Sequence, residues 1–366
     1  MYIAGGCDGA QTCFGGYCTC TAITDEVLAF DPVTNAYTIL PAMPVARYRH
    51  DACALGDTIY YFGGRTLPNS YFVDFIIDQV DAFNTTSRSW TTLPPAANYP
   101  AGLGSDNSCA VVGNVVYLSG GYNADYTVSY SATYAFAPPA VSGGAWWTLR
   151  AGAMLAGRGD FASVAVGGFI HAYGGFVAST TNTNWTCQPL VSHEVYDPVA
   201  DVWGLAAPLP VGLAEKDDGI VLDGVIYSIG GQRTSVTGDC NDLDIVALPY
   251  VFAFDTATTT GWTNVSSLPD GRLRFASAVV GSTIFVFGGQ GALVDGNVLP
   301  VLTTVYSGQL APAAPASNPL SYSPGALAGA IVGTCVATLL LVVLAALGVR
   351  RCRAKAEQSP PVKVQL

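Results

Sequence analysis

A glycine doublet ends an apolar, aromatic segment six times along this chain of 366 residues. The doublets end at Gly6, Gly64, Gly121, Gly175, Gly231 and Gly289, and successive first glycines lie 58, 57, 54, 56 and 58 residues apart. Glycine adopts positive φ angles at little cost, so each doublet predicts a point where the chain turns out of a strand. Six such points at nearly constant spacing predict a repeat architecture.

Aromatic residues recur at two further places in each repeat. After a variable loop, a strand closes on an aromatic residue, at Phe30, Phe83, Phe136, Tyr196, Phe254 and Tyr306. A tryptophan then opens another strand at Trp90, Trp147, Trp203 and Trp262, and Tyr37 takes its place in the first repeat. Proline and small polar residues end that strand, as turn signals do.

This unit resembles the kelch repeat over residues 2 to about 309. The resemblance implies an all-β, six-bladed propeller in which aromatic residues fill the wedges between blades. The first repeat lacks the apolar strand before its doublet and the sixth lacks the tryptophan strand after Tyr306, so we expect incomplete first and last blades. We also expect the precursor to begin upstream of Met1 and to supply both strands together with a signal peptide.

An uncharged run from residue 326 to 349 predicts one transmembrane helix, because it is long enough to cross the ~30 Å hydrocarbon core. Basic residues follow at once, at Arg350, Arg351, Arg353 and Lys355, so the short tail 350–366 is predicted to be cytoplasmic. Residues 310–325 are rich in Ala, Pro and Ser and predict a stalk. The propeller, residues 1–309, is then predicted to be extracellular or lumenal. The membrane is either the plasma membrane or an endomembrane.

Cysteines and glycosylation motifs fit an oxidising compartment. Candidates for disulfides in the loops are Cys7, Cys13, Cys18, Cys20, Cys187 and Cys240, with Cys187 and Cys240 expected to pair across adjacent blades. Zinc is the alternative for the first four, but no histidine supports it, so no metal or cofactor is expected. Cys53 and Cys109 fall in the first strands of their repeats, where they are either buried thiols or a disulfide-bonded pair. N-x-S/T motifs stand at Asn84, Asn184 and Asn264.

Charged residues are scarce, so a position that is charged in every repeat is informative. Counting back fourteen residues from the first glycine of each doublet gives Arg49, Asp106, Asp160, Lys216 and Arg274, and Arg47, Arg158 and Arg272 lie two residues earlier. The kelch resemblance implies that these segments begin the strands that approach the central channel. We therefore predict a rim that binds a polar or charged ligand. The alternative is that these charges pair with one another across blades.

A net charge of −11 and the absence of a basic cluster before residue 350 argue against nucleic acid as a partner. We expect a membrane-anchored recognition module for a protein or glycan ligand, with a purely adhesive scaffold as a further possibility. The alternative is a secretory-pathway kelch enzyme that acts on a sugar or another polar small molecule. No catalytic motif appears, and the three histidines, His50, His171 and His193, fall at different structural positions, which argues against a copper centre.

Overall fold

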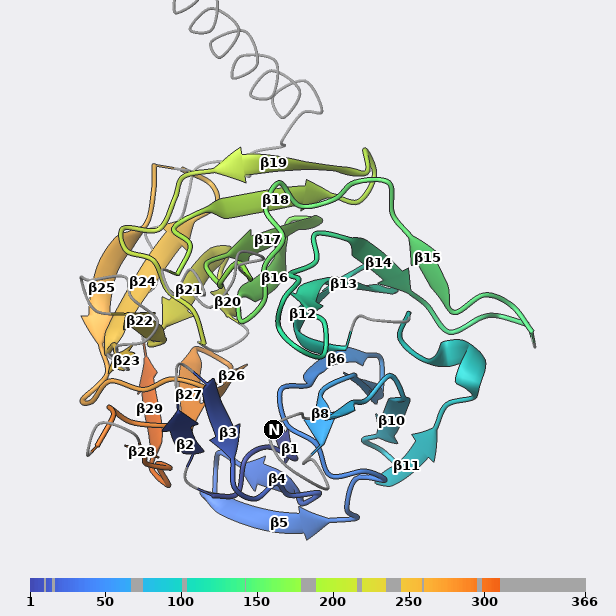
Figure 1. Ribbon diagram of the computed structural model, residues 1–366, viewed down its shortest axis with the longest axis horizontal. Helices are drawn as coiled ribbons and strands as arrows, with labels where there is room; N and C mark the ends of the chain where they lie inside the picture. The colour runs from blue at the N-terminus through green and yellow to red at the C-terminus, as the bar shows by residue number, and fades with distance from the viewer. Residues whose placement is uncertain are drawn as a thin grey trace, which may run out of the picture. The chain divides into compact units, whose positions relative to one another are not determined.

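Six antiparallel sheets are arranged as blades around a central axis (Figure 1). The computed structural model describes residues 1–9, 11–14, 17–66, 75–100, 104–141, 143–178, 189–215, 219–234, 245–258, 260–294 and 298–309. The predicted six-bladed, all-β propeller is confirmed.

The four central blades have four strands each, in sequence order from the channel outwards. Blade 2 comprises β6 (Asp51–Leu55), β7 (Thr58–Phe62), β10 (Val80–Asn84) and β11 (Ser89–Thr92). Blade 3 comprises β12 (Ser105–Val112), β13 (Val115–Tyr122), β14 (Thr133–Phe136) and β15 (Trp147–Leu149). Blade 4 comprises β16 (Ala162–Val166), β17 (Phe169–Tyr173), β18 (His193–Asp197) and β19 (Val202–Ala206). Blade 5 comprises β20 (Ile220–Leu222), β21 (Val225–Ile229), β24 (Tyr250–Asp255) and β25 (Thr263–Ser267).

Blades 1 and 6 have three strands each among the described residues. Blade 1 comprises β1 (Tyr2–Ala4), β4 (Val27–Asp31) and β5 (Ala36–Leu40), and blade 6 comprises β26 (Ala276–Val280), β27 (Thr283–Phe287) and β29 (Val305–Gln309). Blade 1 therefore begins with the strand that is second in the central blades, and blade 6 ends with the strand that is third.

The glycine doublets turn the chain out of the second strand of each blade, as predicted. The first glycine of every doublet has a φ angle between +56° and +72°, and the second has one between +88° and +107°. Close packing adds a further reason for glycine, since a Cβ atom on Gly63 would lie 2.1 Å from the carbonyl oxygen of Gly104 in the next blade. Any other residue would be strained at these positions.

Apolar cores fill the wedges between all neighbouring blades. Phe62 and Phe136 lie in the core between blades 2 and 3, and Tyr173 and Phe254 lie in the core between blades 4 and 5. The core between blades 6 and 1 is small and has Phe30, Phe285 and Phe287 as its buried residues. Apolar packing, much of it aromatic, thus joins neighbouring blades of the ring.

The predicted tryptophans lie in or next to the outermost strands, and three of them tie their blade to the one before it. The indole Nε1 of Trp90 donates to the carbonyl oxygen of Pro41 at 2.8 Å, and that of Trp147 donates to the carbonyl oxygen of Ala97 at 2.9 Å. Trp203 donates to the hydroxyl of Thr133 at 3.0 Å. These bonds satisfy the one polar atom of each of these three indoles, whereas the Nε1 atom of the buried Trp262 has no hydrogen-bond partner among the described residues.

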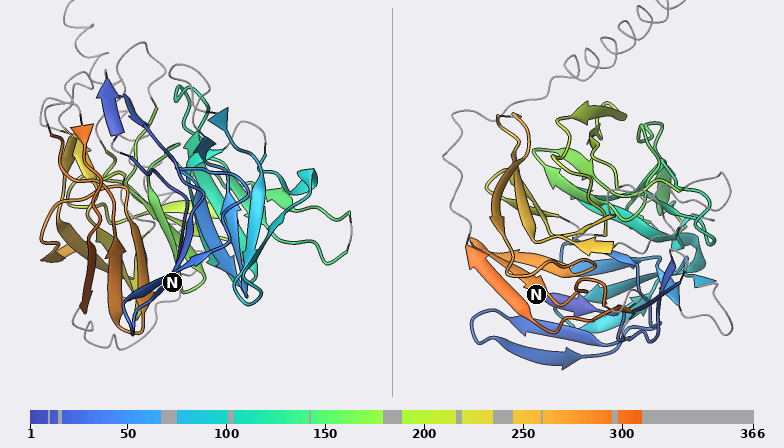
Figure 2. Two further views of the ribbon diagram at one scale, coloured as in Figure 1. Left: turned by 90° about the horizontal axis from the view of Figure 1, so that it is seen from below. Right: turned by 60° about the vertical axis from the view of Figure 1, so that its left-hand side comes forward.

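Segments that follow the glycine doublets leave their blades on one face of the ring, which we call the loop face (upper side of the left view in Figure 2). Short accessory strands form there: β2 (Gln11–Phe14), β3 (Tyr17–Cys20) and β28 (Val298–Leu299) in one sheet, β8 (Arg65–Thr66) with β9 (Phe75–Ile76), and β22 (Gln232–Thr234) with β23 (Ile245–Ala247). Because β28 pairs with β2, the loops of blades 6 and 1 are joined on this face.

The described residues contain a single helical turn, η1 (Pro95–Ala97), and within them no helix combines the length and the apolar character that a bilayer span requires. The predicted stalk 310–325, transmembrane segment 326–349 and tail 350–366 lie outside the described residues.

Candidate functional site

A ring of five charged residues lines the channel at the start of the innermost strands. We call Arg49, Asp106, Asp160, Glu215 and Arg274 the charge ring. All five have φ angles between +51° and +58°, and a backbone ladder links them. The N–H group of each residue donates to the carbonyl oxygen of the preceding one, at distances of 3.2, 3.0, 3.0 and 2.8 Å from Asp106 to Arg274.

The side chains of the charge ring pair with one another across blades. Arg49 contacts the carboxylates of Asp106, of Asp160 at 3.3 Å and of Glu215 at 3.7 Å. Arg274 pairs with Glu215 and donates to the amide oxygen of Gln290 at 3.2 Å. The ring is therefore a mutual network, as the alternative interpretation of the sequence had it.

The pKa values of the three carboxyl groups of the ring are shifted in different directions. Burial raises the pKa of Asp160 well above its usual range, and the nearby Glu215 and Asp106 raise it further. Burial acts in the same direction on Asp106 and Glu215, but the arginines outweigh it, so the pKa of each lies below its usual value. Asp160 is thus the group of the ring that takes up a proton first as the pH falls.

Glu215 occupies the position for which the sequence had suggested Lys216. Blade 5 has one more residue than the other blades between this position and its doublet, so the constant count of fourteen gave the wrong residue. Lys216 lies outside the described residues. The structure places Glu215 at this position, because Ala214 bridges to Gln232 as Tyr48, Gly159 and Leu273 bridge to the residues after their own doublets.

Arg47, Arg158 and Arg272 do not face the channel, contrary to their predicted place on the ligand rim, because each is fully buried inside its blade. The Nη1 atom of Arg158 donates to the carbonyl oxygens of Gly174 at 3.0 Å and Ser192 at 3.3 Å, and its Nη2 atom pairs with Glu194. Equivalent bonds run from Arg47 to Gly63, and from Arg272 to Gly288. These arginines cap the strands next to the doublets and are inaccessible to a ligand.

Arg65 was not predicted from the sequence, yet it adjoins the charge ring. It is fully buried, its Nε atom donates to the hydroxyl of Ser105 at 2.8 Å, and it lies 3.7 Å from the carboxylate of Asp106. The ring of Tyr126 stacks on its guanidinium, with 3.7 Å between the guanidinium carbon and the ring centre. The loop that carries Tyr126 thus covers this side of the ring. The sequence signal that could have identified Arg65 is its position as a charged residue directly after a glycine doublet.

Two of the three histidines meet, although the sequence had placed them apart. His193 is the first residue of β18 rather than part of a loop, and its Nε2 atom lies 3.0 Å from Nδ1 of His171. His193 also contacts the carbonyl oxygen of Ala207 through Nδ1, at 3.2 Å. Within the described ranges, no group of three or more His, Cys, Asp or Glu residues could hold a metal ion.

Acid is expected to destabilise the propeller through its buried histidines. Burial lowers the pKa of His171 to about 4, and burial together with Arg47 lowers that of His50 to about 3. The unfolded chain takes up these protons near pH 6.5 and the folded protein only near those lower values, so the free energy of unfolding falls as the pH is lowered from 6.5 to 4. For His171 the full shift corresponds to about 3 kcal/mol.

The measurement is urea unfolding at several pH values, comparing the chain with its His171→Gln variant. The raised pKa of Asp160 acts in the opposite direction and is common to both proteins, so the difference between them isolates His171. Parallel stability curves for the two proteins between pH 4 and 6.5 would contradict the expectation.

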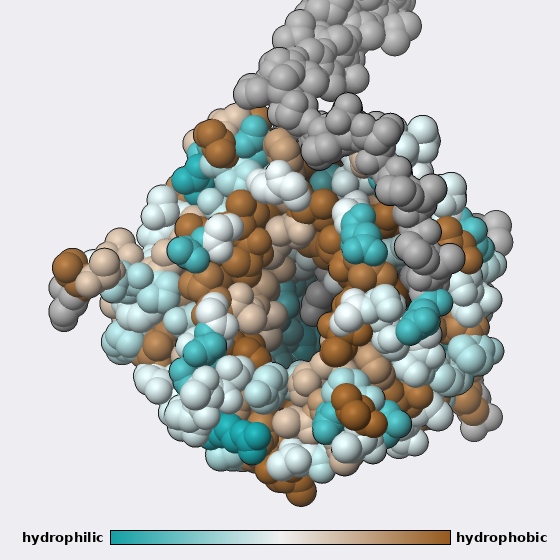
Figure 3. Space-filling view, turned by 180° about the vertical axis from the view of Figure 1, so that it is seen from behind, coloured by the Kyte–Doolittle hydropathy of each residue, from teal (hydrophilic) through white to brown (hydrophobic). Residues whose placement is uncertain are grey.

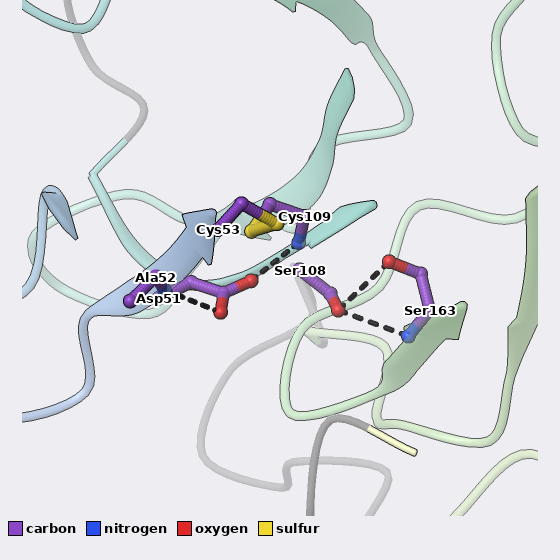
Figure 4. The surroundings of a disulfide bond; sticks show 6 residues. All are labelled: Asp51, Ala52, Cys53, Ser108, Cys109 and Ser163. Atoms are coloured by element: carbon purple, nitrogen blue, oxygen red, sulfur yellow. Dashed lines mark hydrogen bonds between the residues drawn. A yellow bond between two sulfur atoms is a disulfide. The ribbon is translucent and has the colours of Figure 1, made fainter. Parts of the chain in front are cut away.

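Two disulfides are present among the described residues. Cys53 and Cys109, whose Cα atoms are 6.3 Å apart, join the innermost strands of blades 2 and 3 (Figure 4). Cys7 pairs with Cys20 in the first loop. Cys13 and Cys18 stand opposite each other in the β2–β3 register, but their side chains, like Cys187 and Cys240, lie outside the described residues.

Polar side chains reinforce the contact between innermost strands near this disulfide (Figure 4). The carboxylate of Asp51 accepts a hydrogen bond from the N–H group of Cys109, and the hydroxyl of Ser108 accepts one from the N–H group of Ser163 at 2.9 Å. Each bond crosses from one blade to the next. The inner wall of the channel is thus fixed covalently and by hydrogen bonds.

The glycosylation motifs lie at the outer part of their blades where the structure describes them. Asn264 is exposed on β25, and Asn84 is half-buried at the end of β10, where its side-chain oxygen accepts a hydrogen bond from the N–H group of Ser87 at 2.8 Å. Asn184 lies outside the described residues.

Exposed apolar residues recur on the loop face. Blades 2 to 6 each place at least one in or directly after the segment that follows the doublet, namely Phe75, Val128, Val191, Tyr250, Val294 and Val301, with exposed fractions between 39% and 55%. The opposite face has a central hollow with apolar residues around its mouth and hydrophilic residues at its depth (Figure 3). Two surfaces, the loop face and the channel, are thus candidates for binding.

Comparison with known proteins gives a consistent result. A family model described as the KLHDC2/KLHL20/DRC7 Kelch-repeats domain matches residues 1–204, more than half of the chain. Kelch-like protein terF of Aspergillus terreus is 27% identical over 219 residues, which cover 58% of this chain and 45% of that protein. Human Kelch domain-containing protein 3 is 23% identical over 303 residues, 75% of this chain and 73% of its own length.

The solved structure of YjhT has a TM-score of 0.60 at 17% sequence identity, and the match covers 77% of this chain and 87% of that one. At this identity the likeness shows the fold alone. The chain spans less than half the length of the Aspergillus relative, so that protein's full activity does not transfer with the match.

Proposed function

Because the chain belongs to the kelch-repeat family, we propose that its propeller is a recognition module that binds a protein partner through the loop face. Kelch propellers generally serve as protein-interaction modules. The observation that carries the proposal is the set of exposed apolar side chains that successive blades place on this face. Single exposed apolar residues are ordinary on any surface, but equivalent segments of five neighbouring blades share this property.

The charge ring is the weaker candidate for partner binding. Its five side chains are 2% to 16% exposed and already bind one another. A ligand that entered the channel would have to break those ion pairs. Each broken pair would leave a buried charge without its partner, which costs free energy. The loops need no such exchange, and loops on a rigid scaffold commonly carry binding specificity.

We further propose that the propeller faces the cell exterior or an organelle lumen and is anchored by residues 326–349. Two disulfides support an extracellular or lumenal location of the propeller, because disulfides persist in oxidising environments and are rare in the cytosol. The uncharged run with basic residues directly after it supports the anchor and its orientation. Exposure of Asn264 suits glycosylation in the same compartment.

Loop-face substitutions are expected to abolish partner binding while the fold persists. The test uses the full chain on cultured cells, biotinylated with a reagent that does not cross membranes and cross-linked to its neighbours. A variant with Phe75→Asp, Tyr250→Asp and Val294→Asp should lose at least 90% of the cross-linked partner, on the order of the loss when buried anchors are removed. Biotinylation of the propeller in the same cells reports its side of the membrane.

A matched control places the same number of aspartates on exposed apolar residues outside the loop face. Val33 and Val199 are 89% and 96% exposed in turns, and Ile39 is 74% exposed on an outer strand. Their variant should keep the partner. If both variants retain it equally, the loop face is not the binding surface. If intact cells leave the propeller unlabelled, its exposure at the cell surface is excluded, and glycosidase treatment then decides between lumen and cytosol.

A further inference from the structure

The link between the third and fourth strands is longer in blade 3 than in the other blades. Between β14 and β15 it comprises ten residues, 137–146, which we call the arm. The same link has four residues in blades 1, 2 and 4, and seven in blade 5. Figures 1 and 2 show the arm, in green, projecting beyond the outer rim of the ring. The arm is thus an addition to the repeat.

The residue after the closing aromatic explains why blade 3 forms an arm. In blades 1, 2, 4 and 5 this residue has a side-chain oxygen that accepts a hydrogen bond from the N–H group two residues on, at 2.8 to 3.1 Å. These four residues are Asp31, Asn84, Asp197 and Asp255. Such a bond stabilises a compact turn. In blade 3 the residue after Phe136 is Ala137, and its methyl group cannot accept that bond.

The two limbs of the arm are in contact with each other and with the blade. The N–H group of Ala137 donates to the carbonyl oxygen of Trp146 at 3.0 Å. A Cβ atom on Gly144 would lie only 2.7 Å from Cβ of Pro139, so the limbs approach closely at this glycine. At the base, the ring of Trp146 stacks on that of Phe136, with 5.7 Å between the ring centres. The base of the arm is therefore fixed to the blade.

The composition of the arm is unusual for a segment that projects into water. Its sequence, APPAVSGGAW, contains no ionisable side chain. Val141 is 71% exposed. Pro138 and Pro139 have no backbone N–H group, and that of Ala137 is bonded within the arm, so few backbone donors depend on water. The arm can therefore leave water at a small cost in lost hydrogen bonds.

These properties favour a lipid bilayer over a protein as the contact of the arm. The residues that dominate protein interfaces are commonly Trp, Tyr and Arg, whereas the exposed part of the arm offers Pro, Ala and Val. An uncharged apolar segment enters the boundary between headgroups and acyl chains without removing a charge from water. Trp146, half-buried at the base, is of the residue type enriched at membrane interfaces.

The length of the chain after the propeller is compatible with this contact. The stalk expected at 310–325 has sixteen residues, which extend over at most about 55 Å. If residues 326–349 cross a bilayer, as proposed above, the propeller is held within that distance of its surface. An apolar arm on its rim then has a bilayer within reach.

We propose that the arm is a membrane-contact element whose tip inserts among the lipids of a zwitterionic bilayer. Neutral headgroups are the expected surface, because the arm has no basic residue that would attract anionic lipids. Together with the proposed anchor at 326–349, the arm gives the propeller two points of contact with the membrane. Two points of contact limit the rotation of the propeller about its stalk and thereby orient the loop face.

Photolabelling from within the bilayer tests the arm. The full chain is reconstituted into phosphatidylcholine vesicles whose acyl chains carry a diazirine, irradiated, and mapped by mass spectrometry of its peptides. The internal controls are the turns 32–35 and 198–201, whose Val33 and Val199 are 89% and 96% exposed. We expect label in the arm on the order of tenfold above that in these turns, because burial of apolar side chains in the acyl boundary is confined to the arm.

A charge at the tip should remove the contact. Val141→Asp is expected to lower the label in the arm on the order of tenfold, since an ionised carboxylate is disfavoured among acyl chains. Val33→Asp, the matched control, should leave that label unchanged. Both positions are exposed, so the fold should persist in both variants. Equal labelling of the arm in the Val141→Asp variant and the unaltered chain would contradict the proposal.

The same experiment separates the arm from the anchor. Label in 326–349 but not in the arm would overturn the arm and leave the anchor standing. Label in the arm but not in 326–349 would support the arm and overturn the anchor. Label in neither segment would overturn both. None of these outcomes depends on whether the loop face binds a partner.

Discussion

Replacing Arg158 by alanine is expected to lower the free energy of unfolding by about 3–5 kcal/mol, because it leaves the carboxylate of Glu194 buried without its charged partner. Both side chains are 0–1% exposed, and Arg158 also binds the carbonyl oxygens of Gly174 and Ser192. The substitution therefore removes the links that hold together the end of the second strand of blade 4 and the start of its third strand. The measurement is urea unfolding followed by tryptophan fluorescence.

Arg150 provides the matched control, since it too pairs with a carboxylate of blade 4. Its partner is Asp201, at 3.5 Å, and each side chain of this pair is 25% exposed. Arg150→Ala should lose no more than about 1 kcal/mol, as exposed pairs do. Adding Glu194→Gln to Arg158→Ala should recover part of the loss by removing the unpaired charge. Equal losses for Arg158→Ala and Arg150→Ala would mean that the buried arginine is not a blade-stabilising residue.

The periodic signals of the sequence were sufficient for the fold. Glycine doublets, closing aromatics and tryptophans recur at near-constant spacing, and each meets a local requirement: a positive φ angle, a wedge-shaped gap between blades, or an indole donor that reaches the preceding blade. Local requirements of this kind can be read from one repeat at a time. The six blades and the position of Trp90, Trp147 and Trp203 in outer strands followed from them.

The candidate site was only partly predictable, because it depends on the direction of side chains and on contacts between repeats. Arg47 and Arg49 are two residues apart in the sequence, yet one is buried in its blade and the other lines the channel, since Arg49 has a φ angle of +55°. No count of residues distinguishes the two. A single additional residue in blade 5 likewise made the constant count select Lys216 instead of Glu215, which occupies the ring position.

Contacts between distant strands were also beyond the sequence. His171 and His193 are 22 residues apart and come together because β17 pairs with β18, in a register that brings Tyr173 opposite His193. Cys53 and Cys109 could be either free thiols or a pair until the neighbouring positions of β6 and β12 were known. Only the curvature of the ring places these inner strands within reach of each other.

Removing the Cys53–Cys109 disulfide with a Cys53→Ala, Cys109→Ala double variant is expected to lower the free energy of unfolding by about 4 kcal/mol. The bond closes a sequence separation of 56 residues and joins two blades, so the unfolded chain gains much freedom when it is absent. Urea unfolding under non-reducing conditions measures the difference. Alanine avoids the additional penalty of a hydroxyl at these positions.

The Cys7–Cys20 disulfide provides the control. It separates the effect of the length of the closed loop from the effect of losing any disulfide. Its separation is 13 residues, so the same chain-entropy relation gives about 3 kcal/mol, and this bond lies in a loop rather than between blades. The Cys7→Ala, Cys20→Ala variant should therefore lose less than the inter-blade variant, and the opposite order would show that closure of the inner wall is not the main contribution. Both bonds need an oxidising environment to form. In protein made in a reducing cytosol, the free energy of unfolding should therefore be lowered by the sum of the two losses.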